Sequence, residues 1–102
     1  MELDMAMTDL IAQVNRNMAL YGAEFVPISD TSGSAPASVH GMIANAPVRL
    51  DFTVGHEHPD YDYKVWVYSS AGESLGRGNG ASNFEDAIDM YHWQGVVADL
   101  RG

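Results

Sequence analysis

The amino-acid sequence predicts an α+β domain that spans residues 1–102. We expect a helix, a three- to four-stranded antiparallel β-meander and a second helix, with both helices on one face of the sheet. Apolar residues recur at steps of three and four near both ends of the chain, which is the spacing of an amphipathic helix. Between residues 48 and 54 apolar and polar residues alternate, which is typical of a strand with one buried face.

The N-terminal third is expected to contain one helix and a loop. The helix spans about residues 4–21, and Gly22 is a typical C-terminal stop. Its apolar face consists of Leu3, Met7, Leu10, Val14, Met18 and Tyr21. Pro27 follows in a short apolar stretch, and a strand tolerates proline only at a sheet edge. Residues 29–38 are small, polar and aperiodic, so we expect a flexible loop there.

The central part of the chain is expected to form the meander. Residues 39–44 alternate weakly and end at the turn signal Asn45-Ala46-Pro47. A hairpin follows, with strands at residues 47–54 and 61–69. The glycine-bearing stretch 73–80 is expected to form a fourth strand or an extended edge.

The two faces of the hairpin differ in chemistry. Val48, Leu50, Phe52 and Val54 form the apolar face of the first strand. If Val65 and Val67 face the core with them, Trp66 and Tyr68 emerge on the opposite face. Exposed aromatic residues in acidic surroundings are typical of a protein-binding patch. The sequence leaves open whether the faces are exchanged or both covered.

The second helix has a clear start signal. Ser82 with Glu85 fits a capping box, and Asn83 with Asp86 is an equally good pair. Asp89 adds a further negative charge to the first turns, where the helix dipole favours it. One face consists of Phe84, Ala87, Ile88, Tyr91, Gly95 and Ala98, and a nearly opposite face consists of Met90, Trp93, Val97 and Leu100. The second face is expected to pack on the first helix or to bind a partner.

The charge balance points to a basic partner. Fourteen acidic and five basic residues give a formal net charge of −9. Such a field repels nucleic acid and anionic membranes and favours encounter with basic proteins, although acidity can also serve solubility alone. The sequence contains no cysteine, so Cys-based zinc sites and nucleophiles are excluded. We find no signal-peptide pattern and expect a cytoplasmic protein.

The hairpin loop is the one candidate for metal chemistry. His56 and His58 project to one side of an extended segment, and Asp60 and Asp62 add oxygen ligands that zinc or copper would accept. A solvated polar loop explains the same residues. The sequence lacks a nucleophile elbow, a phosphate-binding loop and a His-Glu-x-x-His helix. We therefore expect no catalytic residues, no metal and no cofactor.

Two short motifs resemble known families. Gly78-Asn79-Gly80-Ala81-Ser82 is similar to the Gly-x-Gly-x-Ser that opens the last helix of double-stranded-RNA-binding domains. Acidic residues stand here where that family has lysines, so RNA binding does not carry over. Asn83-Phe84-Glu85-Asp86-Ala87 is similar to the Thr-x-Glu-Glu-Ala of HicB-type antitoxins, whose upstream proline-aspartate-glycine pattern is missing.

In size, charge and α+β pattern the chain resembles the anti-CRISPR inhibitors that phages make. The resemblance implies a non-enzymatic inhibitor in the host cytoplasm that blocks the nucleic-acid-binding surface of a basic protein, such as a CRISPR effector subunit, without binding nucleic acid or membrane. Carboxylates would stand in for phosphates, and the candidate partner-binding residues are Glu57, Asp60, Asp62, Trp66, Tyr68, Glu85, Asp86, Asp89 and Trp93. The alternative is an antitoxin-like or regulatory protein that acts as a homodimer through the face with Met90 and Trp93.

Overall fold

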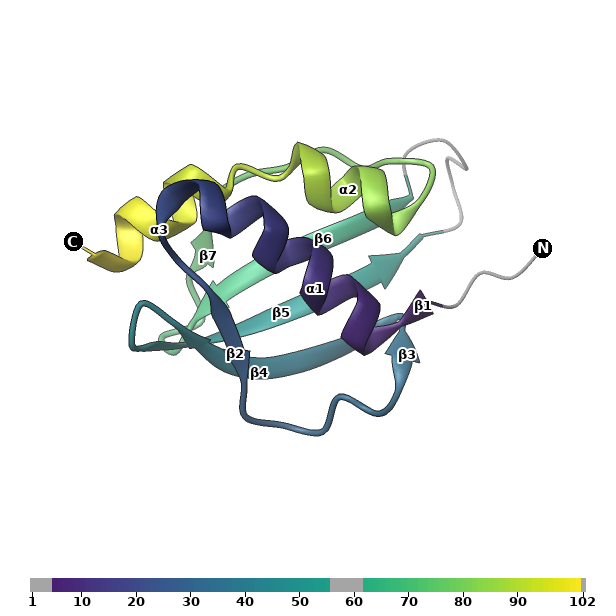
Figure 1. The fold of residues 1–102 in the computed structure, drawn as a ribbon. Helices are drawn as coiled ribbons and strands as arrows, with labels where there is room; N and C mark the ends of the chain where they lie inside the picture. The colour runs from purple at the N-terminus through teal and green to yellow at the C-terminus, as the bar shows by residue number, and fades with distance from the viewer. Residues whose placement is uncertain (1–4, 56–61, 102) are drawn as a thin grey trace.

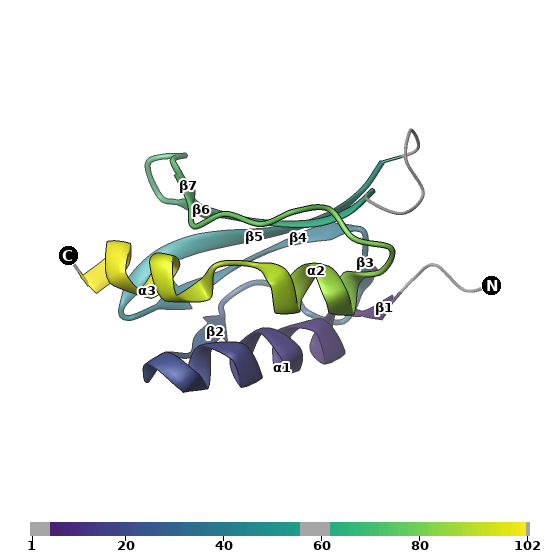
Figure 2. The ribbon, with the colours of Figure 1, turned by 90° about the horizontal axis from the view of Figure 1, so that it is seen from above.

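The computed structural model describes residues 5–55 and 62–101, which form an antiparallel sheet with helices on one face (Figures 1 and 2). The five strands are β2 (Phe25–Pro27), β4 (Ala37–Ile43), β5 (Ala46–Val54), β6 (Tyr63–Ser69) and β7 (Ser74–Leu75), in the spatial order β2-β4-β5-β6-β7. The helices are α1 (Met7–Met18), α2 (Phe84–Met90) and α3 (Trp93–Arg101). A small second sheet pairs β1 (Met5–Ala6) with β3 (Ser34–Ala35). The predicted α+β class is confirmed, but the main sheet has five strands instead of three to four, a second sheet of two strands is present, and there are three helices instead of two among the described residues.

The core lies between the sheet and the helices, as the alternating pattern predicts. Leu50 of β5 lies opposite Val39 of β4 and Val67 of β6, and all three side chains are buried. From the helix layer, α1 contributes three fully buried residues at helical spacing: Leu10, Val14 and Met18. Burial of these apolar surfaces supplies the main favourable contribution to folding.

The N-terminal helix ends as expected. A 3-10 turn, Ala19–Tyr21, extends α1, and Gly22 then adopts a left-handed conformation with φ 69°. The following strand β2 contains Pro27 and lies at the sheet edge, where the missing N–H is tolerated. The turn between β4 and β5 is formed by Ala44 and Asn45, both with positive φ, so Pro47 already belongs to β5.

The loop predicted at residues 29–38 is shorter in the structure, where residues 29–33 lie outside helices and strands. Ser34–Ala35 forms β3, and β4 already begins at Ala37. The side chain of Asp30 accepts a hydrogen bond from the Ser32 backbone N–H at 2.9 Å, which closes a local turn. The sequence gives no local sign of β3, because its partner strand β1 lies almost thirty positions earlier in the chain.

The single C-terminal helix that the sequence predicts is interrupted at Tyr91, which has extended backbone angles (φ −72°, ψ 144°). Its hydroxyl is buried, donates to the Leu75 carbonyl and accepts from the Val67 N–H at 3.3 Å. The next residue, His92, donates its backbone N–H to the Arg77 carbonyl at 2.6 Å. The helix is therefore interrupted where Tyr91 and His92 form hydrogen bonds with β6, β7 and the segment that follows β7. Asn83 is the N-cap of α2, and its side chain accepts a hydrogen bond from the Asp86 N–H at 2.8 Å.

We predict that two glycines with similar backbone angles respond differently to alanine. Gly72 (φ 83°) has open space at its Cβ position, whereas a Cβ at Gly76 (φ 67°) would lie 2.7 Å from Val96 and 2.9 Å from Tyr91. Gly72→Ala should lower the free energy of unfolding by about 1 kcal/mol, the cost of a left-handed alanine. Gly76→Ala should cost a further ~1–3 kcal/mol because it overpacks the core. Urea unfolding measures both, and equal losses would contradict the packing argument.

Candidate functional site

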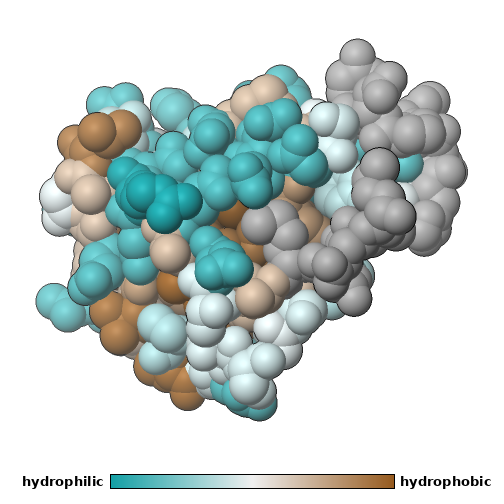
Figure 3. Space-filling view, turned by 45° about the vertical axis from the view of Figure 1, so that its right-hand side comes forward, coloured by the Kyte–Doolittle hydropathy of each residue, from teal (hydrophilic) through white to brown (hydrophobic). Residues whose placement is uncertain are grey.

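The two sides of the molecule carry different side chains. The exposed carboxylates of α1 and α2 are Asp9, Glu85, Asp86 and Asp89, and we call them the acidic helix surface. Arg16 is the only basic residue on these two helices. Hydrophilic residues accordingly cover much of this side in the space-filling view (Figure 3). The helix layer is therefore the negative side of the protein.

Asp89 is the most firmly held carboxylate of this surface. Its Oδ1 atom accepts hydrogen bonds from Asn17 Nδ2 and Gln13 Nε2, both at 3.0 Å. Gln13 is buried, and its Nε2 also donates to the Glu85 carbonyl at 2.9 Å, which joins α1 to α2. Hydrogen bonds from Asn17 and Gln13 lower the pKa of Asp89, because they favour the charged form. Asp89 thus presents a fixed negative charge at neutral pH.

A shallow hollow of about 270 Å³ lies beside Asp89. It is lined by Gln13, Arg16, Asn17, Leu20, Glu85 and Asp89. Leu20 is 77% exposed, so an apolar side chain stands at the edge of the acidic helix surface. A charged surface with one exposed apolar residue at its border is suited to contact another protein.

The opposite face of the sheet is covered by no helix among the described residues (Figure 2). Of the alternatives that the sequence leaves open, the structure has Val65 and Val67 buried, while Trp66 and Tyr68 lie on this open face and are partly exposed. Arg49 and Asp51 form an ion pair at 2.9 Å. The Arg49 guanidinium also lies 4.6 Å from the centre of the Tyr68 ring, a cation–π contact that covers part of that ring.

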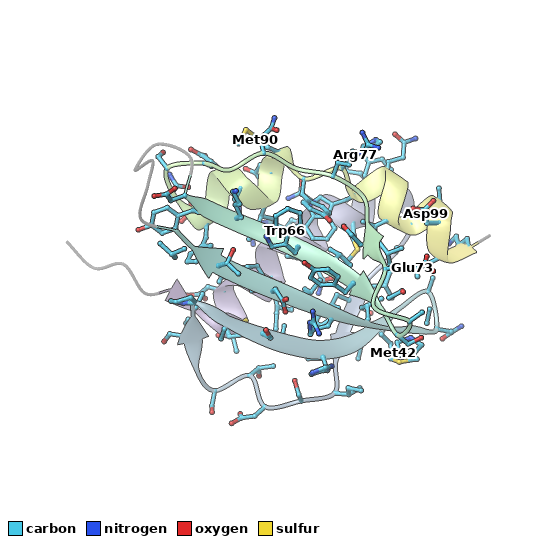
Figure 4. The ribbon with its side chains drawn as sticks, turned by 180° about the vertical axis from the view of Figure 1, so that it is seen from behind. Met42, Trp66, Glu73, Arg77, Met90 and Asp99 are labelled. Carbon is cyan, nitrogen blue, oxygen red and sulfur yellow. The ribbon has the colours of Figure 1, made fainter. Side chains whose placement is uncertain are left out.

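A larger hollow, of about 550 Å³, lies where the open face meets the C-terminal helices (Figure 4). It is lined by Trp66, Ser74, Gly76, Arg77, Gly78, Asn79 and Met90. Trp66 comes from β6, Arg77 from the segment after β7, and Met90 from the end of α2, where its side chain is 49% exposed. Residues from three separate segments thus converge here.

The candidate partner-binding residues do not form one surface. Trp66 and Tyr68 lie on the open face of the sheet, whereas Glu85, Asp86 and Asp89 belong to the helix layer on its other side. Asp62 lies next to β6, and its carbonyl accepts from the Gly55 N–H at 2.9 Å. The remaining loop candidates lie outside the described residues: His56, Glu57, His58 and Asp60.

The prediction that Trp93 is a partner-binding residue is wrong. Trp93 is only 2% exposed, and its Nε1 donates to the Ile88 carbonyl at 2.7 Å. Val97 is buried as well, so two of the four residues of the apolar face proposed for a homodimer belong to the core, whereas Met90 is exposed and Leu100 is partly exposed. The interruption at Tyr91 separates α2 from α3, and Trp93 and Val97 of α3 face the core.

Sequence reasoning missed the amides that hold Asp89. Gln13 and Asn17 are separated by four positions, which places them on the same side of α1, and this spacing was a usable signal. The association of Arg77 and Met90 with Trp66 had no such signal, because the three residues meet only through tertiary structure.

Comparisons with known proteins do not identify the chain. No family model matches it, and no curated protein or solved structure matches it either. Among residues 5–55 and 62–101, no three His, Asp or Glu side chains are grouped so that they could hold a metal ion. In the same part of the chain, no helix has the length and hydropathy needed to cross a membrane.

We predict that Asn17→Ala raises the pKa of Asp89 toward the usual value of about 3.9. In the wild type, the lowered pKa of Asp89 stabilises the folded state at pH values above the usual pKa of an aspartate. This stabilisation is lost as the pH falls through the pKa of Asp89 in the folded state. An NMR titration of the carboxyl carbons measures the change. Asp30, whose pKa is lowered by hydrogen bonds from Ser32, is the control and should not respond. An unchanged Asp89 titration would show that Asn17 does not hold the charge.

Proposed function

We propose that the protein is a non-enzymatic inhibitor that binds a basic, nucleic-acid-binding surface of another protein through its acidic helix surface. The observation that carries this proposal is the fixed carboxylate of Asp89, held by Gln13 and Asn17 among three further exposed carboxylates. Carboxylates at fixed positions can accept the hydrogen bonds that lysine and arginine otherwise donate to phosphates.

The electrostatics of the whole chain support the same partner. A net charge of −9 attracts a basic protein over a distance and raises the rate of encounter. Fixing Asp89 before binding lowers the entropy that is lost when the complex forms. Leu20, exposed at the border of the acidic helix surface, supplies an apolar contact, a role that the sequence assigns to Trp93.

The class of target follows from charge and from resemblance. A protein that handles nucleic acid has a basic surface whose natural ligand is a row of phosphates. In size and charge the chain is similar to anti-CRISPR inhibitors, and this likeness favours a subunit of a CRISPR effector. On this proposal the chain occupies the nucleic-acid site without binding nucleic acid itself.

We predict that neutralising the acidic helix surface abolishes capture of such a target. The test variant combines Asp9→Asn, Glu85→Gln, Asp86→Asn and Asp89→Asn. The control combines Glu24→Gln, Asp30→Asn, Glu73→Gln and Asp99→Asn, which removes four exposed charges from other places. Each variant is immobilised and exposed to a nuclease-treated lysate of the native host cell.

The expected result is a nucleic-acid-binding protein that the wild type and the control retain and that the test variant loses by about tenfold or more. Added duplex DNA should displace it, and high salt should weaken its capture, because both compete with the carboxylates. Equal capture by both variants, or capture that neither DNA nor salt affects, would refute the proposal.

A further inference from the structure

The hollow beside Trp66 forms because the chain stops pairing with β6 after Leu75 and pairs with it again at Ala81. The β6–β7 ladder pairs Val67 with Leu75, and the chain next pairs with β6 through a bridge between Tyr63 and Ala81. Between these two points residues 76–80 depart from the sheet. Trp66 therefore stands on β6 where the neighbouring chain has moved away, and its ring borders the space (Figure 4).

Tyr91 and His92 hold the wall of this hollow in place. A Cβ at Gly78 would lie 2.6 Å from the Tyr91 ring, so the segment approaches that ring as closely as glycine allows. The Arg77 carbonyl accepts the His92 N–H at 2.6 Å. The backbone that carries Arg77 is thus anchored on both sides, and the hollow is a formed site in the protein without ligand.

The charge at this hollow is opposite to that of the whole protein. Arg77 lies on its wall, and among the described residues that line it none is acidic. On the neighbouring open face Lys64 is basic, and the carboxylate of Asp51 is paired with Arg49. A ligand in the hollow is therefore next to the positive charge of Arg77.

We propose that this hollow binds a small aromatic anion, a molecule with an aromatic ring and a phosphate or carboxylate group, with nucleoside monophosphates as the leading class. The ring would lie against Trp66 and the Met90 thioether, and stacking and sulfur–aromatic contacts favour such rings. Arg77 would pair with the anionic group, and Ser74 and Asn79 would supply neutral hydrogen bonds. A volume of about 550 Å³ is of the size that small ligands occupy.

This site is independent of the proposed inhibitory function. It is lined by residues of β6, β7, the segment after β7 and the last residue of α2, and it shares no lining residue with the hollow beside Asp89. A ligand in the hollow therefore does not need the partner protein, and the failure of one proposal leaves the other standing.

The test is an NMR titration of the isotope-labelled full chain in phosphate-free buffer. The probes are AMP, adenosine, inorganic phosphate, indole-3-acetate and a short single-stranded oligothymidylate. The expected result is that AMP shifts the Trp66 indole N–H and the amides of residues 74–79. The Trp93 indole N–H, bonded to Ile88 inside the core, should stay in place and serves as the internal reference. Stronger binding of AMP than of indole-3-acetate would assign a phosphate ligand, and the reverse a carboxylate.

Variants separate the ring contact from the charge contact. Arg77→Gln should weaken AMP binding about tenfold, because it removes a charge-assisted pair. Arg16→Gln on α1 makes the same change of charge outside the hollow and should have no such effect. Trp66→Leu should weaken binding by a similar factor, while Trp66→Phe should retain most of it, because stacking needs an aromatic ring.

Four results would overturn the proposal. They are no shift with either AMP or indole-3-acetate at millimolar concentration, shifts outside the hollow, adenosine or phosphate alone binding as tightly as the tighter of these two anions, and oligothymidylate binding more tightly per molecule than either. The last result would identify a strand-binding face instead of a small-ligand site.

Discussion

The buried hydroxyl of Tyr91 is the contact on which the C-terminal half of the structure depends. It donates to the Leu75 carbonyl and accepts from the Val67 N–H, and so it ties the helix layer to β6 and β7. Burial raises the pKa of this hydroxyl, which keeps it protonated and able to donate. Without the hydroxyl, the Leu75 carbonyl would lose a buried partner, at a cost of about 1–3 kcal/mol.

Several features follow from that single contact. The helix breaks at Tyr91, and the Trp93 ring packs 4.9 Å from the Tyr91 ring inside the core. The glycine-rich segment after β7 passes over Tyr91 and separates from β6, which leaves the hollow beside Trp66. The contacts of Tyr91 therefore account both for the interruption of the helix and for the position of the segment that lines the hollow.

The separation of charge has a different origin, the packing of α1 against α2. Gln13 bonds to the Glu85 carbonyl and, with Asn17, to the Asp89 side chain, so the two helices present their carboxylates on one surface. The helices of the described residues lie on one face of the sheet, and its open face carries Arg49, Lys64, Trp66 and Tyr68. The carboxylates of α1 and α2 and the basic residues of the open face therefore belong to opposite sides of the sheet.

The sequence by itself determined the fold class, the alternation that gives the first strand of the hairpin one apolar face with Leu50 and Phe52, the stop at Gly22 and the start signal at residues 82–86. These features depend on neighbours close in the chain or on the period of the element, so a local pattern contains them. Tertiary structure alone decided the break at Tyr91, the burial of Trp93, the pairing of β1 with β3 and the meeting of Trp66 with Arg77 and Met90. Each of these depends on hydrogen bonds or packing between residues far apart in sequence, and local periodicity carries no information about them.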